Sequence, residues 1–97
     1  MNRVEAIKML DSLGGTVQEV AQSLKDKGIT GARRNPCHCP LANLIGGYVD
    51  NQEGFVGLEE GFELNRPCRD FVLAFDNGLY PELEQGPVWQ SVYMTNI

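Results

Sequence analysis

The sequence is poor in several features that mark particular classes of protein. Its 97 residues include one histidine and three cysteines. No apolar run approaches the roughly 18–20 residues that a membrane-spanning helix needs. An odd number of cysteines argues against a disulfide framework, and the first residues have neither the basic nor the apolar stretch of a signal peptide. We therefore expect no membrane association and a cytoplasmic protein with reduced thiols.

Motifs for phosphate and metal binding are also missing. The glycines of Gly28-Ile29-Thr30-Gly31 follow a predicted helix rather than a strand, so they do not match a dinucleotide-binding turn. A zinc site would have to combine Cys37, Cys39 and Cys68 with His38. Their C-x-C spacing differs from the C-x₂₋₄-C pairs that zinc sites usually contain. We expect no metal and no cofactor.

Basic residues are scarce and unevenly distributed. The chain has 8 Lys and Arg against 13 Asp and Glu, for a net charge of −5. Residues 1–49 carry six basic and four acidic side chains, whereas residues 50–97 carry two basic and nine acidic. Because an acidic protein does not attract nucleic acid through its overall field, we do not expect a nucleic-acid ligand. The acidic half is a solvated surface or a surface that docks onto a basic protein.

What is present is typical of one small globular domain. Hydrophobic residues make up 42% of the chain and charged residues 22%, which is the composition of ordinary soluble domains. Single domains most often have about 100–150 residues. We expect residues 1–97 to form one domain, as a monomer or a small homo-oligomer.

Capping signals predict two helices at the start of the chain. Asn2 with Glu5, and Thr16 with Glu19, are spaced as capping boxes. The glycines at 14–15 separate the two helices. Because the connection is short, we expect an αα-hairpin whose helices pack antiparallel.

The rest of the chain alternates between helical and strand patterns. A third helix is predicted to begin at Cys39-Pro40, since proline is favoured in the first turn. Residues 55–64 read as a β-hairpin, and Asn65 caps a fourth helix that Gly78 ends. The segment 88–94 is rich in strand-forming residues, which makes it a candidate third strand. This order predicts an α+β fold.

The apolar positions of the predicted helices follow one helical face each. Spacings of i, i+3, i+4 and i+7 are typical of a buried stripe. We expect these stripes to meet in one core. Its members are Val17, Val20, Leu24, Leu41, Leu44, Ile45, Phe71, Val72 and Phe75.

Two motifs resemble a known group of proteins. They are Cys39-Pro40-Leu41-Ala42-Asn43 and Phe75-Asp76-Asn77-Gly78-Leu79-Tyr80-Pro81-Glu82-Leu83. In small proteins of actinobacteria and their phages, a Cys-Pro-Leu-Ala helix start and a short hairpin precede a Phe-Asp-x-Gly-x-Tyr-Pro-Glu-Leu element. The resemblance covers about residues 17–84. It implies a shared fold but no activity, and it favours a protein encoded by a phage or mobile element.

The segment before the third helix holds the candidate site residues Arg33, Arg34, His38 and Cys39. Two guanidinium groups beside a helix N-terminus would attract an anion or an acidic loop. The same N-terminus would lower the pKa of a cysteine at the cap, as it would for Cys68 in the fourth helix. The alternatives are that the arginines are merely solvated and that the cysteines are small buried apolar residues.

Two functional hypotheses follow. The first is a non-enzymatic binding protein, without catalytic residues, that recognises a host protein through its surface. The second is a nucleotide or anion binder, or a thiol-dependent enzyme, that uses the loop from Arg33 to Cys39.

Overall fold

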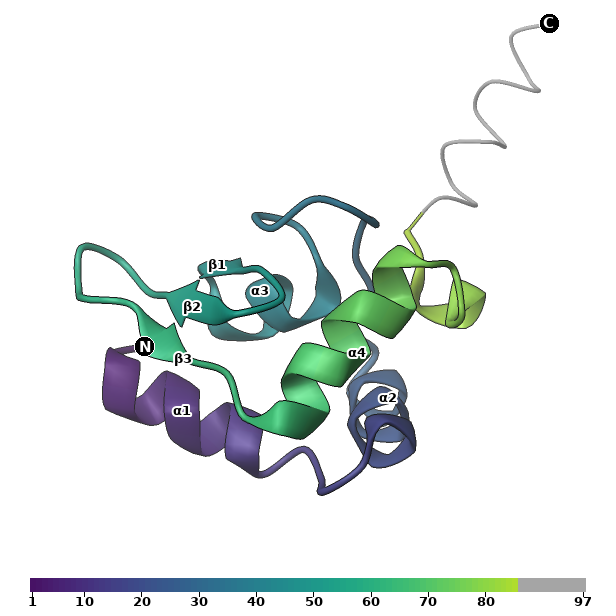
Figure 1. The fold of residues 1–97 in the computed structure, drawn as a ribbon, viewed down its shortest axis with the longest axis horizontal. Helices are drawn as coiled ribbons and strands as arrows, with labels where there is room; N and C mark the ends of the chain where they lie inside the picture. Colours follow the sequence, from purple (N-terminus) through teal and green to yellow (C-terminus); the bar gives the residue numbers. More distant parts are fainter. Residues whose placement is uncertain (86–97) are drawn as a thin grey trace, which may run out of the picture.

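Four α-helices and a small antiparallel sheet make up residues 1–85, the part of the chain that the computed structural model describes (Figure 1). The predicted α+β class is confirmed. In chain order the elements are α1 (Arg3–Asp11), α2 (Val17–Asp26), α3 (Pro40–Ile45), β1 (Tyr48–Val49), β2 (Glu53–Phe55), β3 (Phe62–Glu63), α4 (Arg66–Asp76) and the 3₁₀ helix η1 (Pro81–Leu83). The predicted strand at 88–94 lies outside the described residues.

Local capping explains where the longer helices begin. The Asn2 side chain accepts a hydrogen bond from the Glu5 N–H at 2.8 Å, and Glu5 bonds back to the Asn2 N–H at 3.1 Å. Thr16 caps α2 in the same way, but Glu19 reaches back to the Gly15 N–H at 2.9 Å rather than to Thr16. Each cap of this kind stabilises a helix by about 1 kcal/mol.

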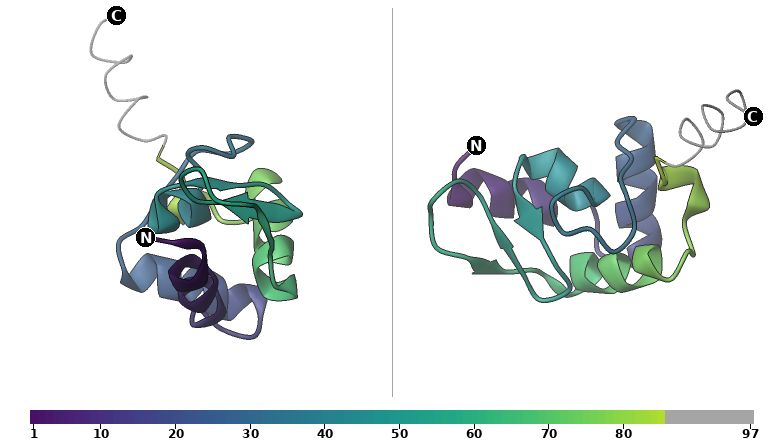
Figure 2. Two further views of the ribbon diagram at one scale, coloured as in Figure 1. Left: turned by 90° about the vertical axis from the view of Figure 1, so that its left-hand side faces the viewer. Right: turned by 90° about the horizontal axis from the view of Figure 1, so that it is seen from above.

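The first two helices do not pack as an antiparallel pair. Figures 1 and 2 show α1 and α2 lying crosswise. Helix α2 packs on α4, and α1 packs on α3. The prediction of antiparallel packing was wrong because the connection over residues 12–16 lets the chain turn, so that the two apolar faces bury against different partners. The Ser23 hydroxyl, which donates to the Leu13 carbonyl at 2.6 Å, helps to fix this turn.

The sheet has the order β1-β2-β3, with both neighbouring pairs antiparallel. Its third strand is β1, which precedes the hairpin. Tyr48 fitted the apolar spacing of the predicted third helix, but Gly46 ends α3 in the left-handed conformation (φ 69°) and Tyr48 begins β1 instead. The first hairpin strand also lies earlier than its apolar residues suggested, at Glu53–Phe55.

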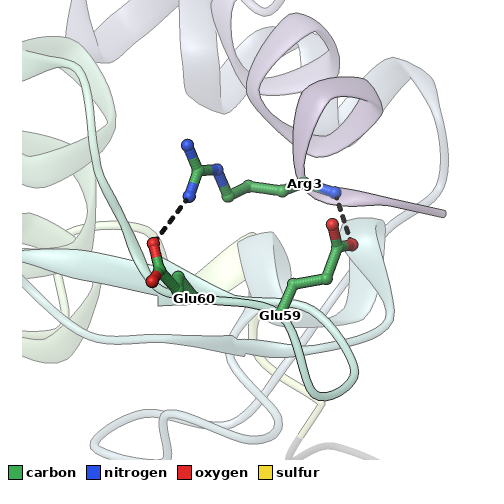
Figure 3. Close-up of polar contacts among 3 residues, drawn as sticks. All are labelled: Arg3, Glu59 and Glu60. Carbon is green, nitrogen blue, oxygen red and sulfur yellow. Dashed lines mark hydrogen bonds and ion pairs between the residues drawn. The ribbon is translucent and has the colours of Figure 1, made fainter.

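The connection between β2 and β3 is tied to the start of α1. Figure 3 shows Arg3 between two glutamates of this connection. Its backbone N–H donates to Glu59 Oε2 at 2.8 Å, and its Nη1 lies 3.5 Å from Glu60 Oε2. Leu58, in the same connection, is fully exposed. We call this contact between Arg3, Glu59 and Glu60 the N-terminal clasp.

One hydrophobic core includes residues of every helix and of strands β1 and β3. The two phenylalanines of α4, Phe71 and Phe75, stack with ring centroids 5.8 Å apart, and Phe71 also lies 5.5 Å from the ring of Tyr80. Most of the predicted core is confirmed as buried: Val20, Leu24, Leu41, Ile45, Phe71, Val72 and Phe75. Val17 and Leu44 are partly buried against it. Within residues 1–85, no helix is both long enough and apolar enough to cross a membrane.

Candidate functional site

The predicted binding loop from Arg33 to Cys39 belongs to a longer loop, residues 29–39, that is fixed in place by backbone hydrogen bonds. The Ala32 N–H donates to the His38 carbonyl at 2.8 Å. Gly31 forms a short parallel bridge with Glu84, in which its N–H donates to Leu83 and its carbonyl accepts from Gln85, both at 2.9 Å. The loop therefore closes against the end of the described chain, and its side chains extend from a defined backbone.

Gly31 is required by this close approach. A Cβ atom at this position would lie 2.4 Å from the His38 carbonyl oxygen and 2.5 Å from the Pro40 nitrogen. Both neighbours are backbone atoms that cannot rotate away, so only glycine allows the loop to fold back here.

The two arginines of the loop turn in different directions. Arg33 Nε lies 3.2 Å from Glu84 Oε1, and its guanidinium lies over Gly78. Arg34 adopts a left-handed backbone conformation (φ 55°), and its N–H donates to Asp76 Oδ1 on α4 at 2.8 Å. Arg33 thus holds the closing segment, whereas Arg34 lies at the side of a groove.

Cys39 is buried at the start of α3. Its Sγ accepts a hydrogen bond from the Ala42 N–H at 3.4 Å and donates to the Val49 carbonyl at 3.6 Å. Burial raises the pKa of the thiol to about 11, although hydrogen bonds from the Ala42 and Leu41 N–H groups act in the opposite direction. The hypothesis of a low-pKa thiolate at this helix start is therefore wrong, because desolvation outweighs the effect of the helix N-terminus.

The remaining loop and thiol residues do not join Cys39 in a catalytic arrangement. His38 and Cys37 are exposed, and the His38 backbone, rather than its ring, supports the loop. Cys68 is buried in α4, and burial raises the pKa of its thiol to about 12. The hypothesis of a lowered pKa is therefore also wrong for Cys68. Within residues 1–85, no three His, Cys, Asp or Glu side chains are grouped as metal ligands.

A groove of about 310 Å³ lies where the loop, the β1–β2 turn and α4 meet. This volume is at the lower end of the range of about 300–1,000 Å³ that is typical of small-molecule pockets. We call it the α4 groove. Its lining residues are Arg34, Asn35, Pro36, Cys39, Val49, Asp50, Asn51, Val72, Leu73 and Asp76.

The α4 groove combines an apolar base with a polar border. Cys39, Val49 and Val72 are almost completely buried members of the core. Leu73, on the next position of α4, is 46% exposed. An apolar side chain that entered the groove would contact Leu73 and displace water from it, which is favourable.

Asp50 is held in one orientation at the border of the groove. Its Oδ1 accepts the N–H groups of Gln52 and Glu53, each at 2.8 Å, and its Oδ2 accepts the Tyr48 hydroxyl at 3.1 Å. The pKa of Asp50 is lowered overall. Partial burial acts to raise this pKa, but the hydrogen bonds from Glu53, Gln52 and Tyr48 together outweigh the effect of burial. This carboxylate is charged at neutral pH.

The α4 groove continues along the helix. A second hollow shares Asn51 and Leu73 with it and adds Gln52, Arg66, Arg69 and Asp70 as lining residues. The surface between α4 and the β1–β2 turn is thus concave over more than one side chain. An extended segment of a partner has room to lie along it.

The structure unites only part of the predicted site. Arg34 and Cys39 line the groove, whereas Arg33 and His38 do not. Asp50, Leu73 and Asp76 were not predicted as site residues. Two signals were available: Leu73 is a large apolar residue outside the buried stripe of α4, and Asp50 and Asp76 belong to the acidic half of the chain.

Searches for related proteins found no match to the chain among family models, curated proteins or solved structures.

Proposed function

We propose that this chain is a small non-enzymatic binding protein that recognises a protein partner through the α4 groove. The observation that carries this proposal is the pairing of an exposed leucine with a concave surface that has an apolar base and charged borders. Interface centres typically combine an apolar pocket with a polar rim. The partner we propose is a host protein, with the chain encoded by a phage or mobile element, as the resemblance implies.

The arrangement of the thiols favours binding over thiol chemistry. A nucleophilic cysteine needs an accessible thiolate and a nearby base. Cys39 and Cys68 are buried and their pKa values are raised. Cys37 is exposed, but it lies outside the groove.

The charges favour a protein partner over a nucleotide or other anion. The predicted anion site needed both arginines, but Arg33 is paired with Glu84. Arg34 shares the groove with the carboxylates of Asp50 and Asp76. Two carboxylates beside one guanidinium repel a phosphate rather than attract it.

The test compares two exposed leucines. Leu73 lines the groove and is 46% exposed, whereas Leu79 lies outside it and is 67% exposed. We expect Leu73→Glu to abolish capture of a host protein by the immobilised chain, while Leu79→Glu retains it. Melting curves should show that both variants fold, since exposed substitutions usually change stability by less than about 0.5 kcal/mol.

Equal capture by the two variants would show that the partner binds at a surface other than the α4 groove. A thermal-shift screen with nucleotides and zinc tests the alternative. A ligand that binds only the folded state raises the melting temperature, so a clear rise with a nucleotide would overturn the proposal.

A further inference from the structure

We infer that the α4 groove recognises a segment of the partner in which an apolar side chain is flanked by a basic one. This inference rests on the proposed function and adds the chemistry of the partner. It follows from the charges at the border of the groove. Asp50 and Asp76 supply two carboxylates, and Arg34 supplies one guanidinium.

Both carboxylates are fixed before any partner binds. Asp76 accepts the Arg34 N–H at 2.8 Å, and Asp50 accepts two backbone N–H groups and a hydroxyl. Groups that are already in position lose little conformational entropy when a ligand arrives. A cationic side chain would therefore find charged acceptors that need no rearrangement.

Neither carboxylate is neutralised by an ion pair within residues 1–85. The ion pairs formed there join Arg3 to Glu60, Arg33 to Glu84 and Arg66 to Asp70. The chain as a whole carries −5, so its field adds to the attraction of a basic segment. Attraction between charges is also stronger beside an apolar surface than in bulk water.

The rest of the groove suits the other parts of such a segment. Leu73 and the apolar base offer contacts to one large apolar side chain. Arg34 presents several N–H donors, which suit the carbonyl oxygens of an extended backbone. The second hollow along α4 is lined by Arg66, Arg69 and Asp70, so it provides space for neutral or acidic residues that follow. The basic side chain therefore belongs at the end of the groove that holds Asp50 and Asp76.

The inference is tested with short peptides that have blocked ends. One carries a leucine flanked by arginines, one the same leucine flanked by glutamates, and one an alanine flanked by arginines. We expect the arginine–leucine peptide to bind the full chain at least about tenfold more tightly than either other peptide. Amide shifts in an NMR titration should centre on Val49–Asn51 and Val72–Asp76.

Variants that remove the two negative charges test whether the basic side chain of the peptide contacts Asp50 and Asp76. Asp50→Asn and Asp76→Asn retain an oxygen that can accept the backbone hydrogen bonds but lose the negative charge. Together they should weaken the arginine–leucine peptide about tenfold or more. Asp26→Asn on α2, whose side chain accepts from Gln22 at 2.8 Å and does not line the groove, is the matched control and should leave affinity unchanged.

The results separate this inference from the function on which it rests. If Leu73→Glu loses the captured partner but the double asparagine variant retains it, the groove binds a protein. The inference that the bound segment is basic is then wrong. If both variants retain the partner, both proposals fail. Equal binding of the acidic peptide, no binding of the arginine–leucine peptide, or amide shifts outside the groove would also overturn the inference.

Discussion

The contact between α2 and α4 and the loop at residues 29–39 are held together by different kinds of interaction. Helices α2 and α4 meet through apolar stripes that contain Val20, Leu24 and Phe71. The loop has no such stripe and is held by backbone hydrogen bonds to Leu83 and Gln85 and by an ion pair. Burial of apolar area supplies most of the stability, whereas the polar contacts determine where the loop lies.

The α4 groove has one side built by each of these regions. The loop contributes Arg34 and Asn35 to the groove, and α4 contributes Val72 and Leu73. One side of the groove is therefore as rigid as the core, and the other depends on a few hydrogen bonds.

The largest effect is expected in the helical contact. Phe71 is 1% exposed, stacks on Phe75 and packs at a tilt against Tyr80. Truncating a buried phenylalanine removes its transfer energy and leaves a cavity, so Phe71→Ala should destabilise the fold by about 3–5 kcal/mol. Chemical denaturation measures this loss. A loss below about 1 kcal/mol would show that the stripes of α2 and α4 are not the main source of stability.

The same contrast explains which parts of the fold could be predicted. Helix caps involve residues three apart, so Asn2, Thr16 and Asn65 were identified from local spacing and are confirmed. The strands have two or three residues each, too few for a reliable alternation. Their positions depend on tertiary contacts, such as that of Gly54 with Phe62, where a Cβ would lie 2.8 Å from the ring.

The candidate site was predictable only in part, for a similar reason. Arg34 stood out because it lies in a basic cluster before a helix. Asp50, Leu73 and Asp76 lie 16 to 42 positions further along the chain, and only the packing of α4 beside the loop brings them together. No local sequence pattern predicts such a contact between distant residues. The burial of Cys39 likewise follows from packing and overrides the local effect of its helix terminus.

The next effect concerns the loop itself. Gly31→Ala places a methyl group against backbone atoms of His38 and Pro40. Overpacking of this kind typically costs about 1–3 kcal/mol, and it should also displace Arg34 from the groove. Gly15→Ala is the control, since its Cβ would meet nothing closer than 3.7 Å. Equal stability of the two variants would show that the loop can relax and is not held as firmly as its hydrogen bonds indicate.

Alkaline pH should lower the stability of the fold through the buried thiols of Cys39 and Cys68. Folding raises the pKa of Cys39 to about 11 and that of Cys68 to about 12, from an ordinary value of 9.0. The unfolded chain therefore loses these protons first, so stability is complete below pH 9 and falls as the pH rises towards the folded values. Each thiol should contribute a slope of about 1.4 kcal/mol per pH unit.

The contribution of the Cys39 thiol can be separated from that of the Cys68 thiol in α4. Cys39→Ala should reduce the alkaline slope by about 1.4 kcal/mol per pH unit between pH 9 and pH 11. Lysine and tyrosine side chains titrate in the same range, so the slopes of variant and wild type must be compared in the same buffers. Identical slopes would mean that the Cys39 thiol is as solvated in the folded protein as in the unfolded one.

The smallest effect is expected in the N-terminal clasp, which has neither an apolar stripe nor shelter from solvent. Glu60 is 92% exposed in its contact with Arg3 (Figure 3). Exposed ion pairs contribute about 0.2–1 kcal/mol and are screened by salt. Glu59 differs because its carboxylate accepts the Arg3 N–H at the start of α1, where a negative charge is also favoured by the helix dipole.

The clasp therefore divides into two parts that mutation can separate. Glu60→Ala should cost no more than about 0.5 kcal/mol, and the cost should disappear near 1 M salt, where the Debye length is about 3 Å. Glu59→Ala should cost up to about 1 kcal/mol and keep part of that cost in salt, because a backbone N–H then loses its acceptor. Glu59→Gln keeps an acceptor oxygen, so its loss of stability should lie between the losses of Glu60→Ala and Glu59→Ala. Denaturation of the three variants at low and high salt measures these losses of stability. If the Glu59 and Glu60 variants lose the same stability and high salt removes both losses, the hydrogen bond from Arg3 to Glu59 contributes no stability beyond the charge of the carboxylate.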